Sequence, residues 1–461
     1  MNAEKGSFRD PFGRVFRKDG KVYRSVFSPG ARAFETARNA GIFDKLIGAG
    51  LLIPHEEIQN FESAPPGTVY SLRHPELPMV SYPWEWSFSM LKDAALLHLE
   101  IMEFLLPLGF WLRDASAFNV QFDGNRLRLI DTLSIGMRVP NSPWIAYGQF
   151  CSHFLAPLSL AAYCDIRTLS LWRNYIDGYP LDLAASLLPS TRKYRLGLFM
   201  HIVLHSKFQV MADRKEDISK DPSKQKTAVS DKGLLGVVRS LRRTIEKINW
   251  KSVSRIWSDY DSIRTYSDDD LQKKRRFIDD CVSRLTPKIV WDLGANRGEF
   301  SHLASKDGSF VVSIDGDPAC TEHSYKVFVG DKRLPILPLT MDLANPSPGL
   351  GWDCSERLGL RDRGPADLVL ALALIHHLVL SACIPMPLIA SWLGSLGKYL
   401  VIEFVPPTDV MVKRLLAGRN GEHLSYDNDS FKSSFSILFD FLDEVKLNNQ
   451  RVLFFCKNKN S

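Results

Sequence analysis

The chain has 461 residues, which is too long for one ordinary hydrophobic core and long enough for two or three domains. Hydrophobic residues make up 45% and charged residues 24% of it, a balance that excludes a disordered or fibrous protein. The formal net charge of +6 is small for this length, and both signs are mixed along the sequence. We therefore expect no nucleic-acid partner.

Signals for export or membrane insertion are missing from the sequence. The first residues lack the apolar stretch of a secretion signal, and no run of about 18 apolar residues predicts a membrane span. The seven cysteines are scattered and include no C-x-x-C pair, which argues against a disulfide framework or a zinc ribbon. We expect a cytoplasmic protein; its oligomeric state is left open.

Residues 1–210 are predicted to form the first domain. A strand-rich start precedes a predicted helix from Ala31 to Ala49, a hinge-like S-Y-P-W-E-W segment and a long predicted helix from Met90 to Leu106. The segment W-L-R-D-A-S-A-F-N-V-Q-F follows, and L-R-L-I-D-T-L-S comes after a short polar turn. This order predicts an α+β domain.

Three polar residues in those last two segments carry a resemblance. Asp114 precedes Asn119 by five positions, and Asp131 comes twelve positions later. The segments resemble the catalytic loop and the metal-binding aspartate of the protein-kinase-like and aminoglycoside-phosphotransferase-like fold. The resemblance implies that Asp114 is a base, while Asn119 and Asp131 hold Mg²⁺ on ATP.

Other residues of this half depart from that fold's pattern. A glycine-rich phosphate loop is missing, and K-V-Y-R-S-V places Arg24 where a strand lysine would pair with phosphate. An inactive kinase-like domain is therefore one alternative. The other is that the three polar residues only cap turns, since Asp and Asn are ordinary turn residues.

A charged segment separates the two halves of the chain. Residues 211–232 contain many charged and almost no large apolar side chains, which predicts a solvated linker. Residues 233–280 are predicted to be a helical lead-in, because apolar residues recur at helical spacing with Arg and Lys between them. We interpret the basic face of this helix as a solvated surface.

Residues 281–461 predict an α/β domain. From Lys288 the sequence K-I-V-W-D-L-G-A-N-R-G-E-F-S reads as a buried strand, a glycine turn and a helix start. Gly294 and Gly298 allow the backbone to turn sharply and to approach a ligand closely. The next strand, S-F-V-V-S-I-D, ends in Asp315, where an acid can bind ribose hydroxyls. Five further strands are predicted in L-P-I-L-P-L-T, A-D-L-V-L-A, G-K-Y-L-V-I-E-F, F-L-D-E-V-K-L and R-V-L-F-F-C-K, the last two antiparallel.

The glycine turn, the acid after the second strand and D-L-V-L-A-L-A-L-I-H-H-L resemble motifs of class I S-adenosylmethionine-dependent methyltransferases, which have a Rossmann-like sheet. The resemblance implies S-adenosylmethionine as cofactor. It assigns the cofactor's parts to ten residues: Asp292, Gly294, Asn296 and Gly298 at the methionine, Asp315 at the ribose, Asp342 at the adenine, and Leu370, Ala371, Leu372 and Ala373 at the sulfonium. The main rival is a dinucleotide dehydrogenase, but the turn reads G-A-N-R-G and not G-x-G-x-x-G.

Two residues are candidates for the chemistry. Methyl transfer depends mainly on alignment, with a base only where the acceptor loses a proton. His377 follows the fourth strand and is the candidate base, with a packed or helix-capping histidine as the alternative. Glu403 ends the fifth strand and either binds or deprotonates substrate or holds a neighbouring loop. Trp257, Tyr260 and Tyr266 precede the first strand and either cover the cofactor or pack on the core.

Both halves together resemble a bacterial group of two-domain proteins that includes nodulation-type and polysaccharide-associated methyltransferases. This resemblance implies a methyltransferase that acts on a small-molecule or saccharide acceptor by O-methylation. Two alternatives stay open: a bifunctional kinase and methyltransferase that uses Mg-ATP in its first domain, and a non-catalytic scaffold with a vestigial nucleoside pocket.

Overall fold

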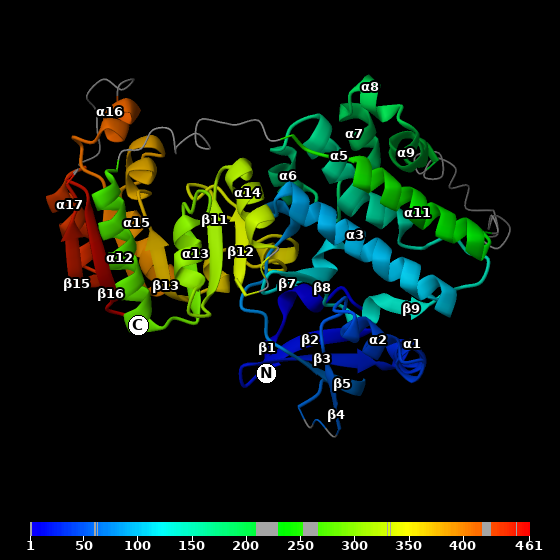
Figure 1. Ribbon diagram of the computed structural model, residues 1–461. Helices are drawn as coiled ribbons and strands as arrows, with labels where there is room; N and C mark the ends of the chain where they lie inside the picture. The colour runs from blue at the N-terminus through cyan, green and yellow to red at the C-terminus, as the bar shows by residue number, and fades with distance from the viewer. Residues whose placement is uncertain are drawn as a thin grey trace. The chain divides into compact units, whose positions relative to one another are not determined.

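A computed structural model describes residues 2–59, 61, 63–208, 229–251, 266–329, 331, 333–416, 426–448 and 450–461 (Figure 1). The chain divides into two compact units: Met1–Lys251 with Leu350–Arg357, and Ser252–Gly349 with Leu358–Ser461. Most of the predicted linker, residues 211–228, lies outside the described residues. In the described part of the chain, none of the helices combines the length and the hydropathy that crossing a bilayer requires.

The first unit begins with a five-stranded antiparallel sheet in the order β1-β2-β3-β5-β4. Its strands are β1 (Asn2–Ala3), β2 (Gly13–Lys18), β3 (Lys21–Phe27), β4 (Glu56–Ile58) and β5 (Thr68–His74). Helices α1 (Ser28–Asn39) and α2 (Ile42–Gly48) lie between β3 and β4 in the sequence. The single helix predicted from Ala31 to Ala49 is therefore wrong, because Gly41 has a left-handed backbone, with φ of 65°, that ends one helix before the next begins.

The rest of the first unit is mainly helical. Helix α3 (Phe88–Leu105) agrees with the predicted helix, and two short antiparallel pairs follow: β6 (Phe110–Leu112) with β9 (Ile135–Met137), and β7 (Val120–Asp123) with β8 (Arg126–Leu129). The later helices are α4 (Tyr147–Phe150), α5 (Ala156–Tyr163), α6 (Thr168–Leu171), α7 (Leu181–Leu187), α8 (Ser190–Lys193) and α9 (Leu196–Leu198), with π-helical turns at Cys151–Leu155 and Phe199–Leu204.

Helix α11 (Asp231–Lys247) also belongs to the first unit, so the predicted lead-in, residues 233–280, is divided between the units. The helix packs against α3 and buries four apolar side chains: Leu234, Val238, Leu241 and Ile245. At its carboxyl end, Lys92 Nζ of α3 donates hydrogen bonds to the carbonyl oxygens of Glu246 and Ile248, at 3.0 and 2.8 Å. A cation at a helix carboxyl terminus satisfies carbonyls that the helix itself leaves unbonded.

Segment Leu350–Arg357 is part of the first unit although residues on both sides of it belong to the second. Arg9 binds the buried carboxylate of Glu356 through Nε at 2.7 Å and Nη2 at 3.0 Å. The guanidinium carbon of Arg357 lies 4.1 Å from the ring centroid of Phe118. These contacts attach the segment to the first unit by charge and by ring stacking.

The second unit contains a seven-stranded sheet in the order β12-β11-β10-β13-β14-β16-β15. Its strands are β10 (Ile289–Leu293), β11 (Phe310–Asp315), β12 (Ile336–Thr340), β13 (Ala366–Ala371), β14 (Gly397–Phe404), β15 (Phe439–Lys446) and β16 (Val452–Asn458). The first five are parallel and the last two antiparallel, as the sequence predicts. Almost every position of β10, β11 and β13 is buried, as in parallel sheets that are covered on both faces.

Helices connect these strands: α12 (Asp268–Leu285), α13 (Glu299–Ser305), α14 (Pro318–Phe328), α15 (Met386–Leu396), α16 (Val410–Leu416) and α17 (Asn428–Ser436). Helix α12 contributes Phe277, Ile278 and Cys281 to a core that also contains Val290 and Val311. Strand β10 pairs with β11 on one side and with β13 on the other, so the strand order reverses there. In open α/β sheets the crevice at such a switch point, beyond the carboxyl ends of the strands, is where ligands bind.

Candidate functional site

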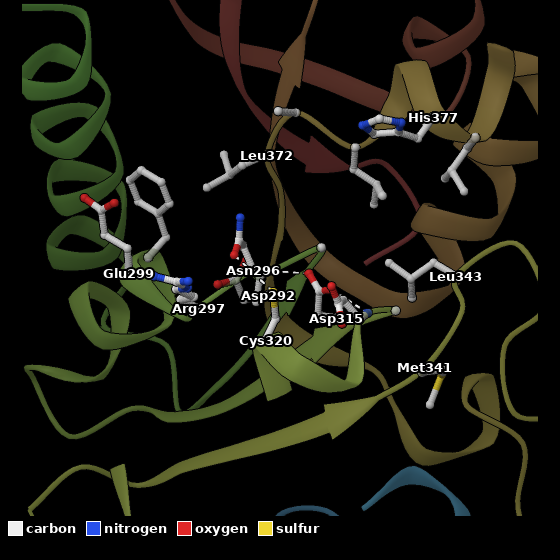
Figure 2. Close-up of a pocket in the computed structure, with 18 of the residues that line it drawn as sticks. Asp292, Asn296, Arg297, Glu299, Asp315, Cys320, Met341, Leu343, Leu372 and His377 are labelled. Atoms are coloured by element: carbon white, nitrogen blue, oxygen red, sulfur yellow. Dashed lines mark hydrogen bonds between the residues drawn. The ribbon is translucent and has the colours of Figure 1, made fainter. Parts of the chain in front are cut away.

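The second unit has a cavity of about 1060 Å³ at the carboxyl ends of the parallel strands (Figure 2). A cavity of this size suits a small-molecule ligand. Eight of the residues predicted for the site line it: Asp292, Gly294, Asn296, Asp315, Asp342, Leu372, Ala373 and His377. Four others do not: Gly298, Leu370, Ala371 and Glu403. Within the range predicted for the sulfonium side, the cavity is thus lined by the two residues that follow the fourth strand, and Leu374 lines it as well.

The glycine turn after β10 has a left-handed backbone at three positions: Gly294 (φ 77°), Asn296 (φ 50°) and Gly298 (φ 81°). The N–H groups of Gly294 and Ala295 both donate to the carbonyl oxygen of Ile314 in β11, at 2.8 and 3.0 Å. A Cβ on Gly298 would lie only 2.8 Å from Phe328 Cε2. Gly298 thus shapes the turn from behind, through close packing on α14, and not by touching the cavity.

Asp315, at the end of β11, is held by the turns on both sides of it. Its Oδ2 accepts a hydrogen bond from Asn296 N at 2.7 Å, and its Oδ1 accepts one from Asp317 N at 2.8 Å. Burial raises the pKa of Asp315, although these two N–H donors act in the opposite direction. Each oxygen of a carboxylate has a second lone pair, so Asp315 can still accept two ligand hydroxyls.

Asp292, at the end of β10, is buried in the cavity wall. Its Oδ2 accepts a 2.6 Å hydrogen bond from Ser301 Oγ. Burial raises the pKa of Asp292 to about 6, while Ser301 and the charge of Lys274 act against that rise.

Asp342, after β12, is exposed and accepts a hydrogen bond from Ala344 N at 2.9 Å. Its position is therefore set by a local turn and not by a distant partner.

His377 lies on the cavity wall beside His376, with 4.1 Å between the ring centroids. His376 is fully buried, whereas His377 is half-buried. Burial and the charge of Arg451 lower the pKa of His377 to about 4. His377 is thus a neutral imidazole at neutral pH, the form that can accept a proton.

Glu403 is fully buried at the end of β14. Its carboxylate accepts hydrogen bonds from Tyr266 Oη at 2.6 Å and from Lys274 Nζ at 2.7 Å, and Arg451 Nη1 lies 3.5 Å away. Burial opposes its ionisation, but Lys274 and Arg451 outweigh that effect and lower the pKa of Glu403. These contacts favour the second of its predicted roles, holding neighbouring segments of the chain.

Tyr266 and Lys274 line the cavity. Tyr266 was predicted to cover the cofactor or to pack on the core; Trp257 and Tyr260 lie outside the described residues. Lys274 was not predicted as a site residue. Its neighbours, D-D-D-L-Q-K-K-R-R-F, are so polar that they indicate a solvated helix face. Only the fold brings β14, more than a hundred residues later, against this lysine.

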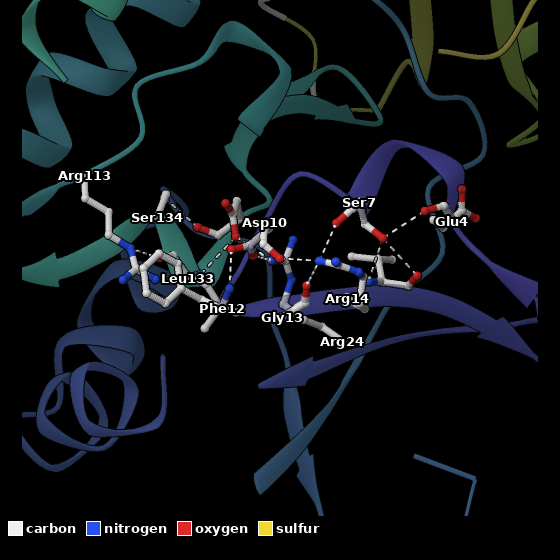
Figure 3. A network of polar contacts seen from close by, with 12 residues as sticks. Glu4, Ser7, Asp10, Phe12, Gly13, Arg14, Arg24, Arg113, Leu133 and Ser134 are labelled. Carbon is white, nitrogen blue, oxygen red and sulfur yellow. Dashed lines mark hydrogen bonds and ion pairs between the residues drawn. The ribbon is translucent and has the colours of Figure 1, made fainter. Parts of the chain in front are cut away.

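In the first unit, Asp131 is paired with Arg24, whose surroundings Figure 3 shows. Its Oδ1 lies 2.6 Å from Arg24 Nη1 and also accepts a 3.0 Å hydrogen bond from Leu133 N. The same guanidinium nitrogen lies 3.4 Å from Asp10 Oδ2. Burial raises the pKa of Asp131, and Arg24 acts against the rise. Arg113 lies over the ring of Phe12, 3.5 Å from its centroid.

The other two residues of the kinase-like resemblance, Asp114 and Asn119, also lie in the first unit. Asp114 Oδ1 accepts hydrogen bonds from Ser116 N at 2.9 Å and from Gln149 Nε2 at 2.8 Å. The side-chain nitrogen of Asn119 is buried without a hydrogen-bond partner. Among the described residues, no group of three or more His, Cys, Asp or Glu side chains is arranged to hold a metal ion. With Arg24 on Asp131, these residues do not fit a Mg²⁺ ion.

The second unit is thus an open α/β domain with a cavity at the switch point of its sheet, the place where such folds bind ligands. Over 436 residues the chain is 34% identical to the nodulation protein NoeA of Rhizobium meliloti strain 1021. The match covers 94% of this chain and 90% of that protein, so the chain belongs to the NoeA family. No protein-family model matches the chain.

Three solved structures are similar to parts of the chain. The magnesium protoporphyrin IX methyltransferase ChlM of Synechocystis PCC 6803 is 18% identical, with 40% of this chain and 84% of that chain covered and a TM-score of 0.29. The N-methyltransferase NodS of Bradyrhizobium japonicum WM9 is 11% identical, with 42% and 98% covered and a TM-score of 0.32. WbdD is 14% identical, with 45% and 44% covered and a TM-score of 0.31. Likenesses this weak add nothing to what the strand order itself establishes.

Proposed function

We propose that the chain is an S-adenosylmethionine-dependent methyltransferase whose cofactor binds in the cavity of the second unit. The observation that carries the proposal is the hydrogen bond between Asn296 N and Asp315. It joins the glycine turn to the strand-terminal acid at the point where the strand order reverses. A close-approach turn beside an acid is the arrangement that binds a nucleoside through its ribose.

The charge of the cavity wall supports this cofactor over a dinucleotide. Six carboxylic acids line the cavity, and only three Lys or Arg side chains do. The acids are Asp268, Asp292, Glu299, Asp315, Asp317 and Asp342. An adenosyl sulfonium is a cation, whereas the pyrophosphate of NAD is an anion. An excess of carboxylates favours the first and repels the second.

The chain's own residues have separate tasks in this reaction. S-adenosylmethionine supplies the methyl group when it is bound. Asp315 holds the ribose, Asp342 lies at the adenine end, and the left-handed turn at Gly294 allows the main chain to approach the ligand. His377, neutral and on the wall, takes the proton of an acceptor hydroxyl. The acceptor that we propose is a small molecule or saccharide that is methylated on oxygen.

Calorimetry with S-adenosylmethionine and S-adenosylhomocysteine on the full chain tests this function. We expect both compounds to bind the wild-type chain. The Asp315→Ala variant should have a lower affinity for both. A folded wild-type chain that binds neither compound contradicts the proposal. Binding without methyl transfer to any saccharide or small-molecule hydroxyl would favour the alternative, a scaffold that retains a nucleoside pocket.

For the first unit we infer a kinase-like domain that does not use Mg-ATP. Its antiparallel sheet, the helix after β3 and the paired strands around Asp114, Asn119 and Asp131 support the kinase-like expectation. Phosphoryl transfer needs a carboxylate that is available to Mg²⁺. Asp131 is instead paired with Arg24. Mg²⁺-dependent ATP binding by the wild-type chain, lost in Asp131→Asn, would overturn this inference and support the bifunctional alternative.

A further inference from the structure

Lys274 is the buried cation of the cavity wall. It lies on α12, and its side chain is only 4% exposed. Its Nζ lies 4.8 Å from the ring centroid of Tyr266 and 4.7 Å from that of Phe300, and both rings also line the cavity. The other two basic side chains of the wall, Arg275 and Arg297, are exposed, and Arg275 pairs with Glu299 at 2.7 Å. A cation that is shielded from water by two rings attracts an anion more strongly than an exposed one does.

Lys274 is paired with the residues behind it. Its Nζ donates to Glu403 Oε2 at 2.7 Å and to Tyr266 Oη at 3.2 Å. Arg451 shares Glu403 and also pairs with Asp409 at 2.9 Å. Two acids and two bases therefore balance each other within this group. A lysine ammonium has three N–H donors, so one donor of Lys274 is left for a ligand in the cavity.

Asp292 supplies the opposite charge on the same wall. The charge of Lys274 lowers the pKa of Asp292 against the effect of burial, so each group lies in the field of the other. Ser301 binds one oxygen of this carboxylate. A cation and an anion on the wall of one cavity complement the zwitterion of an α-amino acid, which carries a carboxylate and an ammonium on one carbon.

We propose that Lys274 binds the carboxylate of the cofactor's amino-acid part, that Asp292 faces its ammonium, and that Glu403 and Tyr266 are positioning residues that hold the Lys274 ammonium at the wall. The inference rests on the proposed function, because the amino-acid part belongs to S-adenosylmethionine. It gives Glu403 a task that needs no contact with the acceptor.

Two ligands that differ only in the amino-acid part test the inference by calorimetry on the full chain. S-adenosylhomocysteine has this part, and 5′-methylthioadenosine keeps the adenosine and the thioether sulfur without it. The variant Lys274→Met keeps the length of the side chain between the two rings and removes the charge. We expect this variant to lower the affinity for S-adenosylhomocysteine about 10- to 100-fold, which is the effect of one charged hydrogen bond. The affinity for 5′-methylthioadenosine should stay unchanged.

Two further variants keep the result interpretable. Arg275→Met removes the neighbouring exposed cation and is expected to change neither affinity. The double variant Lys274→Met, Glu403→Gln removes both charges of the buried pair, so it folds even if the single variant leaves an intolerable carboxylate. The double variant is expected to show the same selective loss.

The outcomes separate the inference from the function on which it rests. Equal weakening of both ligands would mean that Lys274 only maintains the fold, and unchanged binding of both would mean that it does not touch the ligand. Either result overturns the role of Lys274 and leaves the methyltransferase proposal intact. A wild-type chain that binds neither ligand overturns the methyltransferase proposal, and the inference with it.

Discussion

Asn296 N donates a 2.7 Å hydrogen bond to the carboxylate of Asp315, which joins the turn after β10 to the end of β11. The acid therefore has two tasks, since it fixes the shape of the turn and also faces the cavity. Replacing Asp315 should therefore weaken the binding of every ligand that contains the ribose.

Asp315→Ala should lower the affinity for S-adenosylhomocysteine and for 5′-methylthioadenosine alike, by about 10- to 100-fold. Both ligands lose the same charged hydrogen bonds to the carboxylate. Calorimetry measures both affinities. Asp342→Ala is the matched control: its carboxylate is exposed and bound only to its own turn, so a smaller loss is expected. An undiminished affinity in Asp315→Ala would remove the ribose assignment.

Binding of S-adenosylhomocysteine should weaken in acid. Burial raises the pKa of Asp292 to about 6, so this carboxyl group is ionised above that pH and neutral below it. Since the ligand ammonium binds the ionised form, affinity should be full near pH 8 and fall by up to about tenfold per unit below pH 6. In Asp292→Asn this acid-dependent loss should disappear. A flat profile in the wild-type chain would show that Asp292 does not face the ammonium.

His377 should stay neutral well into the acid range, because its pKa is lowered to about 4. In NMR spectra its ring resonances, assigned by their loss in His377→Asn, should not titrate between about pH 8 and pH 5. With an acceptor in hand, the same variant should lower kcat about 100-fold or more and leave cofactor affinity unchanged. If kcat is unchanged, His377 is not the base, and the alternative of a packed histidine holds.

Gly298→Ala should destabilise the second unit more than an ordinary glycine replacement. The new Cβ would lie 2.8 Å from Phe328 Cε2, and the position has a φ of 81°. Gly308→Ala is the matched control, because it also has a positive φ, of 87°, but nothing within 4 Å of the new atom. Chemical denaturation should show a loss of about 1 kcal/mol for Gly308→Ala. A further loss of about 1–3 kcal/mol is expected for Gly298→Ala, and equal losses would contradict the packing argument.

Arg24→Met should destabilise the first unit by about 3 kcal/mol, because it leaves the Asp131 carboxylate uncompensated in a site that is only 13% exposed. Arg17→Met removes an arginine of the neighbouring strand that is likewise paired with two carboxylates, those of Glu4 and Glu76. Its side chain is 39% exposed, so about 1 kcal/mol or less is expected. Denaturant titrations measure both, and a small loss for Arg24→Met would argue against a fixed pair.

The sequence alone predicted the second unit well, since its signals are local. Buried parallel strands are continuous apolar runs, and each of the seven predicted strands is present in the sheet. The glycine turn and Asp315 follow directly from their strands, and in the structure Asn296 N of the turn donates a hydrogen bond to Asp315. Of the four residues predicted for the sulfonium side, Leu372 and Ala373, which follow the strand, line the cavity, whereas Leu370 and Ala371 in the strand do not.

Long-range electrostatics could not be predicted in the same way. Lys274 stands in a polar helix sequence, and nothing local distinguishes it from Lys273 or Arg275. Its burial depends on β14 and on Arg451, which only the folded sheet brings close. Arg24 is a similar case: the sequence showed that it replaces a lysine, but not that its guanidinium would pair with Asp131. Charge pairing between distant segments is a property of the fold.

The course of the backbone determines how the gene can be divided. Because Leu350–Arg357 belongs to the first unit, the polypeptide passes from one unit to the other three times. A fragment that stops at Lys251 leaves Arg9 without Glu356, and the complementary fragment carries that acid away from the guanidinium that neutralises it. A fragment that ends at Lys251 therefore lacks a segment of its own unit and should be less stable than that unit in the full chain.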